Sequence, residues 1–381
     1  METKERLLKY KDRGPEVVKL QKMLKELGLF SGPITGYFGP LTLKAVLTFQ
    51  RRRGLRPDGL VGAATWRELL ILAEAGPGKI IFRSDRQGVY NLYWFNFYGV
   101  KIEPLTSGLE VTSAAKVSPD GKNLAFINNY REIWLLNLTL KKSRKIFRSN
   151  LNVGEFSWNS DGRKLVFDQV SKDGAVSAGI FILNIDTGQV QKLTDGVSPN
   201  WGRIREEIIF NSQDGKILAI RPNGSGERVI LRPENTGGPL WLPKWSWDNS
   251  FVAATGPGTS ISIIRIFKPD GSGMVEVASG ELGKDYLPTW ANRDNLLAYL
   301  SQKVDYSYSL KIVKAREANA PQTITTTNRA YSPAWNKGDH YLAFTQKLDK
   351  EEIFIVNILG TKLLNITKGF GNCNSPTWVV S

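Results

Sequence analysis

Few side chains of this sequence could support metal-dependent or nucleophilic catalysis. The chain has one histidine, His340, and one cysteine, Cys373. A catalytic zinc site usually needs several histidine ligands, and a Ser-His-Asp site would need that same single histidine. No Gly-x-Ser-x-Gly segment is present to form a nucleophile elbow. We therefore expect no metal, no cofactor and no catalytic triad.

A Cys-His pair and a carboxylate pair are the other kinds of catalytic site that these residue types could form. A Cys-His pair would need Cys373 beside His340, but Cys373 lies in a loop before an expected strand and His340 in a hairpin turn. We expect these two segments on opposite faces of the molecule, which separates the pair. Carboxylate pairs for glycoside cleavage stay open, because no spacing singles one out.

Three aromatic residues recur at one position of a repeated phrase and could bind a ligand. Trp241, Tyr286 and Tyr331 each stand two residues before a proline. If the fold brings these positions to the mouth of a central funnel, their rings form a platform for a sugar or a peptide. The alternative is that they fill space between larger repeats.

The elements that position these residues differ between the two parts of the chain. Apolar residues recur at helical spacing from Pro15 to Gly28 and from Pro40 to Arg53, and a third helix is predicted from Ala63 onward. Gly-rich turns separate the helices. The segment from residue 75 to 78 is predicted to be a linker between a helical domain, residues 1–74, and a β domain, residues 79–381.

The helical part contains a series of short motifs that run in order and without gaps from about Arg13 to Leu70. The segments are Gly14–Gln21, Leu27-Gly28, Gly36–Thr42, Ala45-Val46, Phe49-Gln50, Gly54-Leu55, Asp58–Gly62 and Thr65-Trp66. In these segments the chain resembles the three-helix peptidoglycan-binding domain that accompanies many bacterial wall hydrolases. In the first turn this chain has Thr35-Gly36, where the family often has Asp-Gly.

The resemblance implies binding to the glycan or the stem peptide of peptidoglycan. Tyr37, expected to be exposed, could stack on a sugar, and Gln50, Arg51 and Asp58 could bond hydroxyl or amide groups. Asp58 could equally cap its own turn. Arg51 begins a run of three arginines, which we interpret as a solvated helix end rather than a phosphate clamp.

The β part consists of repeats. A phrase of proline, any residue, tryptophan, a polar turn and an apolar strand recurs at Val117, where valine replaces the tryptophan, and at Trp158, Trp201, Trp245, Trp290, Trp335 and Trp378, at intervals of 41 to 45 residues. Each unit contains four short strand patterns, which is typical of a β-propeller blade. We expect each repeated tryptophan to pack between blades.

The two ends of the β part complete each other. It begins at Lys79–Phe82 with a second-strand pattern, and the segment from Ser375 to Val380 is a first strand with no successor. Pairing them closes a ring of seven blades and removes an exposed sheet edge. The predicted fold is therefore mostly β, a seven-bladed β-propeller preceded by a small three-helix domain.

The repeats resemble the TolB-type propellers of bacterial envelope proteins, which are cousins of WD-repeat blades. Together with the first resemblance, this implies a non-catalytic peptidoglycan-binding protein whose propeller presents a surface to an envelope protein or a glycan. The alternative is a wall-remodelling hydrolase with an unrecognised acidic site in the propeller.

The net charge of +15 attracts polyanions. The basic residues are dispersed and no reading motif is present, so we expect no nucleic-acid partner. No apolar window is long enough to span a membrane, and the charged segment from Met1 to Gly14 shows no secretory signal. The expected location is the cell wall or the extracytoplasmic envelope, with spore-associated and cytoplasmic locations as alternatives.

Overall fold

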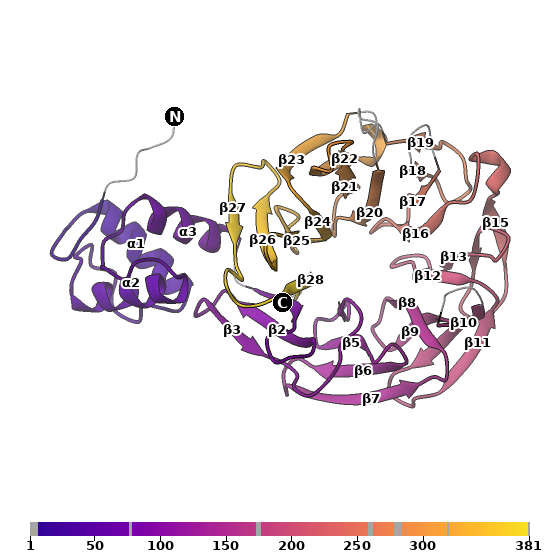
Figure 1. The fold of residues 1–381 in the computed structure, drawn as a ribbon, viewed down its shortest axis with the longest axis horizontal. Coiled ribbons are helices and arrows are strands. Elements are labelled where there is room, and N and C mark those ends of the chain that lie inside the picture. The colour runs from indigo at the N-terminus through magenta and orange to yellow at the C-terminus, as the bar shows by residue number, and fades with distance from the viewer. Residues whose placement is uncertain are drawn as a thin grey trace.

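The computed structural model of the chain describes residues 7–75, 78–172, 177–257, 262–277, 284–317 and 320–379. It contains three helices followed by a seven-bladed β-propeller, which confirms the predicted fold class. Figure 1 shows the seven sheets arranged in a ring, with the helices beside β27 and β3. Of the predicted linker, Gly76 and Pro77 lie outside the described residues.

The small domain is a bundle of three short helices, α1 (Pro15–Glu26), α2 (Pro40–Arg52) and α3 (Ala63–Glu74). Proline opens α1 and α2, where its missing N–H group costs nothing. The apolar stripes of the helices meet in one core, which includes Leu20, Val46, Phe49, Trp66 and Leu69. No helix among the described residues has the length and apolar character that crossing a membrane requires.

Each propeller blade is a four-stranded antiparallel sheet. Blade 1 contains β28 (Cys373–Trp378), β1 (Lys79–Ser84), β2 (Asn91–Asn96) and β3 (Lys101–Pro104). Blade 2 contains β4 (Lys116–Val117), β5 (Asn123–Asn128), β6 (Glu132–Asn137) and β7 (Lys142–Arg148). Blade 3 contains β8 (Asn152–Trp158), β9 (Lys164–Val170), β10 (Ser177–Asn184) and β11 (Val190–Thr194).

The other four blades repeat this pattern. Blade 4 contains β12 (Val197–Trp201), β13 (Ile208–Asn211), β14 (Ile217–Ile220) and β15 (Arg228–Leu231). Blade 5 contains β16 (Trp241–Trp245), β17 (Val252–Gly256), β18 (Ile263–Phe267) and β19 (Val275–Glu276). Blade 6 contains β20 (Lys284–Trp290), β21 (Leu296–Gln302), β22 (Tyr308–Lys314) and β23 (Gln322–Thr327). Blade 7 contains β24 (Ala330–Trp335), β25 (Tyr341–Lys347), β26 (Glu351–Asn357) and β27 (Leu363–Asn365).

The ring closes in blade 1 as the sequence predicts. β28 pairs antiparallel with β1, with Trp378 opposite Ile80 and Cys373 opposite Ser84. The strand from the C-terminal part of the propeller thereby covers the edge of the first strand. With this pairing, β1 has a hydrogen-bonded strand on each side, as the second strand of each of the other six blades has.

The innermost strands of five blades share a backbone irregularity. The residue before the proline of the repeated phrase has a positive φ, from 53° to 56°, in each of them. These residues are Ser198, Leu242, Leu287, Ser332 and Ser375. In β16, β20 and β24 the sheet register shifts at this point, so the irregularity is a β-bulge. The bulge bends each inner strand where it enters the ring.

The repeated tryptophans lie between blades, as expected. Most are buried, and four indole N–H groups donate to a carbonyl of a preceding inner strand. Trp158 Nε1 donates to Lys116 over 2.8 Å, and Trp290 Nε1 donates to Lys244 over 3.0 Å. Trp335 and Trp378 make the equivalent bonds to Thr289 and Ala334. Each of these four indole groups therefore joins its blade to the preceding blade.

The small domain is docked on blades 1 and 7. Arg53, only 8% exposed, pairs with Glu68 over 2.7 Å and donates to the carbonyl of Asn365 in β27 over 2.5 Å. On the other side, the Gly99 N–H donates to the Leu27 carbonyl over 2.6 Å. The interpretation of the arginine run as a solvated helix end is wrong for Arg53, because that side chain is buried against the propeller.

Candidate functional site

Tyr37 follows the first Gly-rich turn of the small domain. Its ring is half-buried, and the guanidinium of Arg13 lies 4.2 Å from the ring centre. Its other neighbour is Gly39, where a Cβ would come within 3.1 Å of the ring. The sequence-based expectation of an exposed ring is therefore wrong. A ligand would meet Tyr37 together with Arg13, not as an open aromatic face.

Gln50 and Asp58 hold the second Gly-rich turn. Gln50 is 1% exposed, and its Nε2 donates to Asp58 Oδ1 over 3.1 Å and to the Leu60 carbonyl over 2.9 Å. Its Oε1 accepts the Gly59 N–H over 3.0 Å. Asp58 also accepts the Leu60 N–H, and this bond lowers the pKa of the Asp58 carboxyl. Asp58 is exposed, so it can still meet a ligand, whereas Gln50 is fully engaged inside the domain.

A second glutamine performs the same task in the first turn, and sequence reasoning missed it. Gln21, in α1, accepts the N–H groups of Thr35 and Gly36, each over 3.0 Å, and donates to the Tyr37 carbonyl. A buried amide satisfies several backbone groups at once, which fixes a loop that has no regular structure. The repeated glutamine position before each turn is the signal that could have found it.

Arg51 lines a shallow hollow of about 240 Å³ on the small domain. Its other lining residues are the apolar Pro40, Leu43 and Leu47 together with Tyr10 and Lys44. An apolar lining with one aromatic ring and two cations suits a sugar or a short acidic peptide. The structure thus brings Arg51 to a hollow that Tyr37, Gln50 and Asp58 do not line.

Trp241, Tyr286 and Tyr331 lie within the first three residues of the inner strands of three successive blades. They stand just before the bulges, at one end of the central channel, which we call the upper mouth. Trp241 is 48% exposed. Tyr286 and Tyr331 are half-buried against the core between blades 6 and 7, and Tyr286 packs edge-on against Tyr308. Only Trp241 therefore presents an open ring, and the two tyrosines partly fill space, as the alternative interpretation held.

A polar network beside Tyr331 was not foreseen from the sequence. Arg83 Nε donates to Asn374 Oδ1 over 2.9 Å, and Asn374 Nδ2 donates to Glu351 over 2.7 Å. The guanidinium of Arg83 lies 5.0 Å from the ring centre of Tyr90. Burial lowers the pKa of Arg83 and raises that of Tyr331. The network joins blades 1 and 7 at the upper mouth and gives that mouth a polar side.

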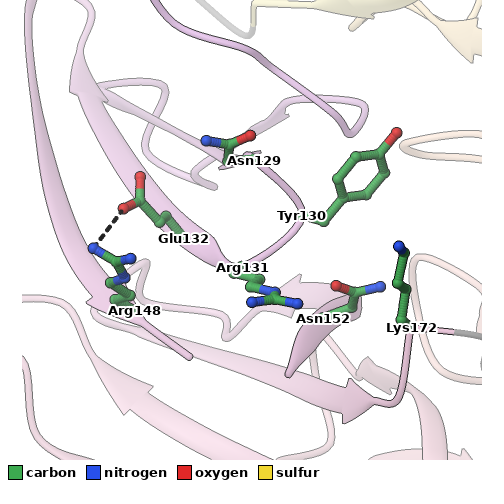
Figure 2. Close-up of a pocket in the computed structure, with 7 residues that line it drawn as sticks. All are labelled: Asn129, Tyr130, Arg131, Glu132, Arg148, Asn152 and Lys172. Atoms are coloured by element: carbon green, nitrogen blue, oxygen red, sulfur yellow. Dashed lines mark ion pairs between the residues drawn. The ribbon is translucent and has the colours of Figure 1, made fainter. Parts of the chain in front are cut away.

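A hollow beside the upper mouth lies between blades 2 and 3. Figure 2 shows Tyr130 and Lys172 on one side of it and the Arg148–Glu132 ion pair on the other. Its volume is about 630 Å³, and it is lined by Asn129, Tyr130, Arg131, Glu132, Arg148, Asn152 and Lys172. Asn129 and Tyr130 both have a positive φ, 53° and 59°. This turn holds Tyr130 outward, 57% exposed.

Charged side chains from three blades meet inside the channel. The Nζ atoms of Lys116 and Lys244 lie 3.2 and 3.3 Å from the same oxygen of Glu155. The two ammonium groups lower the pKa of the Glu155 carboxyl. Nearby, burial raises the pKa of Asp168 to about 6, and the charge of Glu155 adds to this effect. The pKa values of the two carboxyl groups are therefore shifted in opposite directions.

The candidates for metal and thiol chemistry lie apart. His340 is exposed on the turn between β24 and β25, and Cys373 is buried at the start of β28. Burial raises the pKa of the Cys373 thiol to about 11. Among the described residues, no three His, Cys, Asp or Glu side chains lie close enough together to hold a metal ion.

Comparison with known proteins gives a family match for the small domain. Residues 13–69 match the family model described as a putative peptidoglycan binding domain. This segment is 47% identical over 68 residues to an uncharacterised protein of Kitasatospora aureofaciens, covering 18% of this chain and 58% of that protein. It is 38% identical over 65 residues to the N-acetylmuramoyl-L-alanine amidase CwlM of Mycobacterium tuberculosis, covering 17% of this chain and 16% of that protein. The chain thus spans less than two thirds of the length of these relatives.

The propeller is similar to solved structures in fold alone. An oligogalacturonate lyase of Vibrio parahaemolyticus aligns with a TM-score of 0.61 and 17% identity, covering 74% of this chain and 86% of that chain. TolB of Acinetobacter baumannii aligns with a TM-score of 0.55 and 14% identity, covering 92% of this chain and 75% of that chain. The N-terminal part is therefore a peptidoglycan-binding domain, and the propeller has TolB-like neighbours.

Proposed function

We propose that the chain is a non-catalytic peptidoglycan-binding protein in the cell wall or the extracytoplasmic envelope. The small domain binds the wall, and the upper mouth of the propeller presents a surface to an envelope protein or a glycan. The observation that carries this proposal is the family match over residues 13–69, the part of the chain that also forms the Arg51 hollow. Arg13, Tyr37, Arg51 and Asp58 are the proposed wall contacts.

The proposed binding role of the propeller is argued from the side chains on its surface. The upper mouth offers the open ring of Trp241, and the adjacent hollow offers Tyr130 with two amides and three cations. Aromatic rings bind sugar faces, and amide and guanidinium groups bond hydroxyl and carboxylate oxygens. A glycan or a protein segment with both characters fits this surface.

Co-sedimentation with purified peptidoglycan sacculi tests the wall-binding proposal. The full chain should pellet with sacculi at low and at high salt, because stacking and hydrogen bonds resist screening whereas the +15 charge does not. Arg51→Ala should weaken pelleting. Arg67→Ala removes an equally charged, exposed side chain from α3 of the same domain and serves as the matched control. Pelleting that high salt abolishes would contradict the proposal.

A wall-remodelling hydrolase is the second candidate, and one observation favours it. Glu155 and Asp168 form a pair of carboxyl groups whose surroundings drive their pKa values apart, which is the usual mark of an acid and a base in one site. Asp168, however, is 3% exposed and lies behind the channel wall. Release of soluble fragments from sacculi by pure protein, abolished by Asp168→Asn, would establish this function in place of the first.

A further inference from the structure

The hollow between blades 2 and 3 carries more positive than negative charge. Among the described residues that line it, Arg131, Arg148 and Lys172 are cations and Glu132 is the one acid. Figure 2 shows Arg131 between the side of the hollow that holds Tyr130 and Lys172 and the side that holds Arg148 and Glu132. Whether this charge is available to a ligand depends on what the acid and the cations already contact.

The carboxylate of Glu132 is balanced within blade 2. Its Oε2 accepts a bond from Asn128 Nδ2 over 3.0 Å and one from the indole N–H of Trp134 over 2.9 Å. Its Oε1 accepts a bond from Lys145 Nζ over 3.0 Å. Burial by itself would raise the pKa of Glu132, but these bonds outweigh it and lower the pKa to about 2. The acid is therefore ionised and has its own counter-ion in Lys145, which does not line the hollow.

The three cations of the hollow are available to a ligand. A guanidinium nitrogen of Arg148 lies 4.0 Å from Glu132, and 72% of the Arg148 side chain is exposed. The side chains of Arg131 and Lys172 are exposed, and neither forms a hydrogen bond or an ion pair with another residue that the structure describes. An anionic group in the hollow would gain charge-assisted bonds without displacing an existing partner of Arg131 or Lys172.

A strained turn holds the ring of Tyr130 beside these cations. The left-handed φ of Asn129 and Tyr130 is uncommon for a residue as bulky as tyrosine and costs free energy. The Asn129 N–H donates to the Glu110 carbonyl over 2.9 Å. The Tyr130 N–H donates to Thr112 Oγ1 over 3.0 Å, and the Tyr130 carbonyl accepts the Val153 N–H over 2.7 Å. The ring is thus fixed in an exposed position before a ligand arrives, which reduces the entropy lost on binding.

We propose that this hollow binds an acidic saccharide, with a sugar ring stacked on Tyr130 and a carboxylate of the saccharide bound by Arg131. The side-chain amides of Asn129 and Asn152 also line the hollow and can bond sugar hydroxyl groups. A simple anion would not use the exposed ring, and a neutral glycan would not use the cations, whereas a sugar that carries a carboxylate uses both. The inference rests on the proposed function, in which the propeller binds a glycan, and names the chemical class of that glycan.

Calorimetric titration of the full chain at constant ionic strength tests this inference. The acidic probes are a hyaluronan tetrasaccharide, which carries glucuronate, and N-acetylmuramic acid, which carries a lactyl carboxylate, so they distinguish a uronate from a wall sugar. Chitotetraose is the neutral sugar control, and succinate is the sugar-free dianion. We expect at least one acidic probe to bind at least about tenfold more tightly than both controls. Failure of both acidic probes to do so would overturn the inference.

Two variants locate the binding. Tyr130→Asn removes the ring and introduces a residue type that adopts a left-handed φ more readily, so the turn should stay folded. Its affinity for the acidic probe should fall about fivefold to tenfold, and Arg131→Gln should lower the affinity at least as much.

The control variants lie on the equivalent turns of other blades. Tyr306, between β21 and β22, is 76% exposed with a φ of 64° and does not line the hollow. Lys350, between β25 and β26, is exposed. Tyr306→Asn and Lys350→Gln should each change the affinity less than about twofold. Equal losses in Tyr130→Asn and Tyr306→Asn, or in Arg131→Gln and Lys350→Gln, would contradict the assignment to this hollow.

Co-sedimentation with sacculi separates this inference from the proposed wall binding. A chain that pellets with sacculi but binds no acidic probe would overturn the inference and leave wall binding by the small domain intact. A chain that binds an acidic probe through Tyr130 and Arg131 but does not pellet would support the inference and overturn wall binding.

Discussion

The carboxylate of Asp168 occupies the space that a side chain at Gly154 would need. A Cβ on Gly154 would overlap Oδ1 of Asp168, so only glycine fits there. Gly154 is the blade 3 equivalent of Trp241, Tyr286 and Tyr331, and the aromatic series is interrupted at the buried acid. In blade 3 the carboxylate of Asp168 therefore fills the space beside Gly154, at the position where blades 5, 6 and 7 have aromatic residues.

Asp168 should make the protein less stable as the pH rises. Its pKa is raised to about 6 from the ordinary value of 3.8, so the fold favours the protonated form. Stability is full below about pH 4, falls between pH 4 and 6, and stays lower above that. Asp168→Asn should therefore gain up to about 3 kcal/mol at pH 8 and nothing at pH 4, since one pKa unit corresponds to about 1.4 kcal/mol.

Urea unfolding at both pH values measures this difference. Asp349→Asn, on the exposed turn between β25 and β26, is the control and should behave as the parent does. A stability gain in Asp168→Asn of the same size at pH 4 and pH 8 would refute the assignment.

Arg53 should be the main link between the two domains. Arg53→Ala leaves Glu68 buried without its partner and removes the bonds to Asn365 and Ile366. Removing one member of a buried ion pair costs about 3–5 kcal/mol. Calorimetry should then resolve two transitions, the first from the small domain. Arg53→Lys should not restore a single transition, because an ammonium lacks the planar fork that reaches both carbonyls. An unchanged melting profile for Arg53→Ala would contradict the role.

The bulge residue of blade 5 should tolerate glycine better than a branched side chain. Leu242 has a φ of 54°, a conformation that costs an ordinary residue about 1–2 kcal/mol. In Leu242→Gly the relief of strain offsets the greater entropy of the unfolded chain, so stability should change little. Leu242→Val should be destabilised by more than 1 kcal/mol. Urea midpoints compare the two, and equal losses would show that the side chain, not the backbone, sets the cost.

The thiol of Cys373 should report on ring closure. It is fully buried at the start of β28, and its pKa is raised to about 11. Reaction with a disulfide reagent at pH 8 should be at least about a hundredfold slower in the native protein than in urea, because the thiolate is both rare and inaccessible. Fast labelling of the native protein would mean that β28 opens frequently.

Much of this fold follows from repetition in the sequence. The tryptophan phrase recurs every 41 to 45 residues, and a missing first strand at one end matches a surplus strand at the other, so blade number and closure could be predicted. The three helices follow from their apolar periodicity and their proline and glycine boundaries. These are local signals, repeated often enough to be unambiguous.

The site was harder to predict because it depends on contacts between distant segments. Gln50 matches a family motif, but only the structure shows that its amide group is hydrogen-bonded to the turn around Asp58. Arg53 belongs to a run that the sequence predicts to be solvated, and its two propeller acceptors lie more than 300 residues away. The Lys116–Glu155–Lys244 cluster joins three blades. It could not be predicted from the sequence, because its residues are far apart along the chain and their spacing follows no motif.

The docking of the small domain across blades 1 and 7 also orders events during synthesis. The acceptors of Arg53, at Asn365 and Ile366, leave the ribosome long after α2 has been made. At ordinary elongation rates of about 5–20 residues per second, the wait is on the order of 15–60 s. A chain that ends before β27 leaves the small domain without these acceptors and the edge of β1 without its partner strand. Docking through Arg53 therefore requires that nearly the whole propeller has been made first.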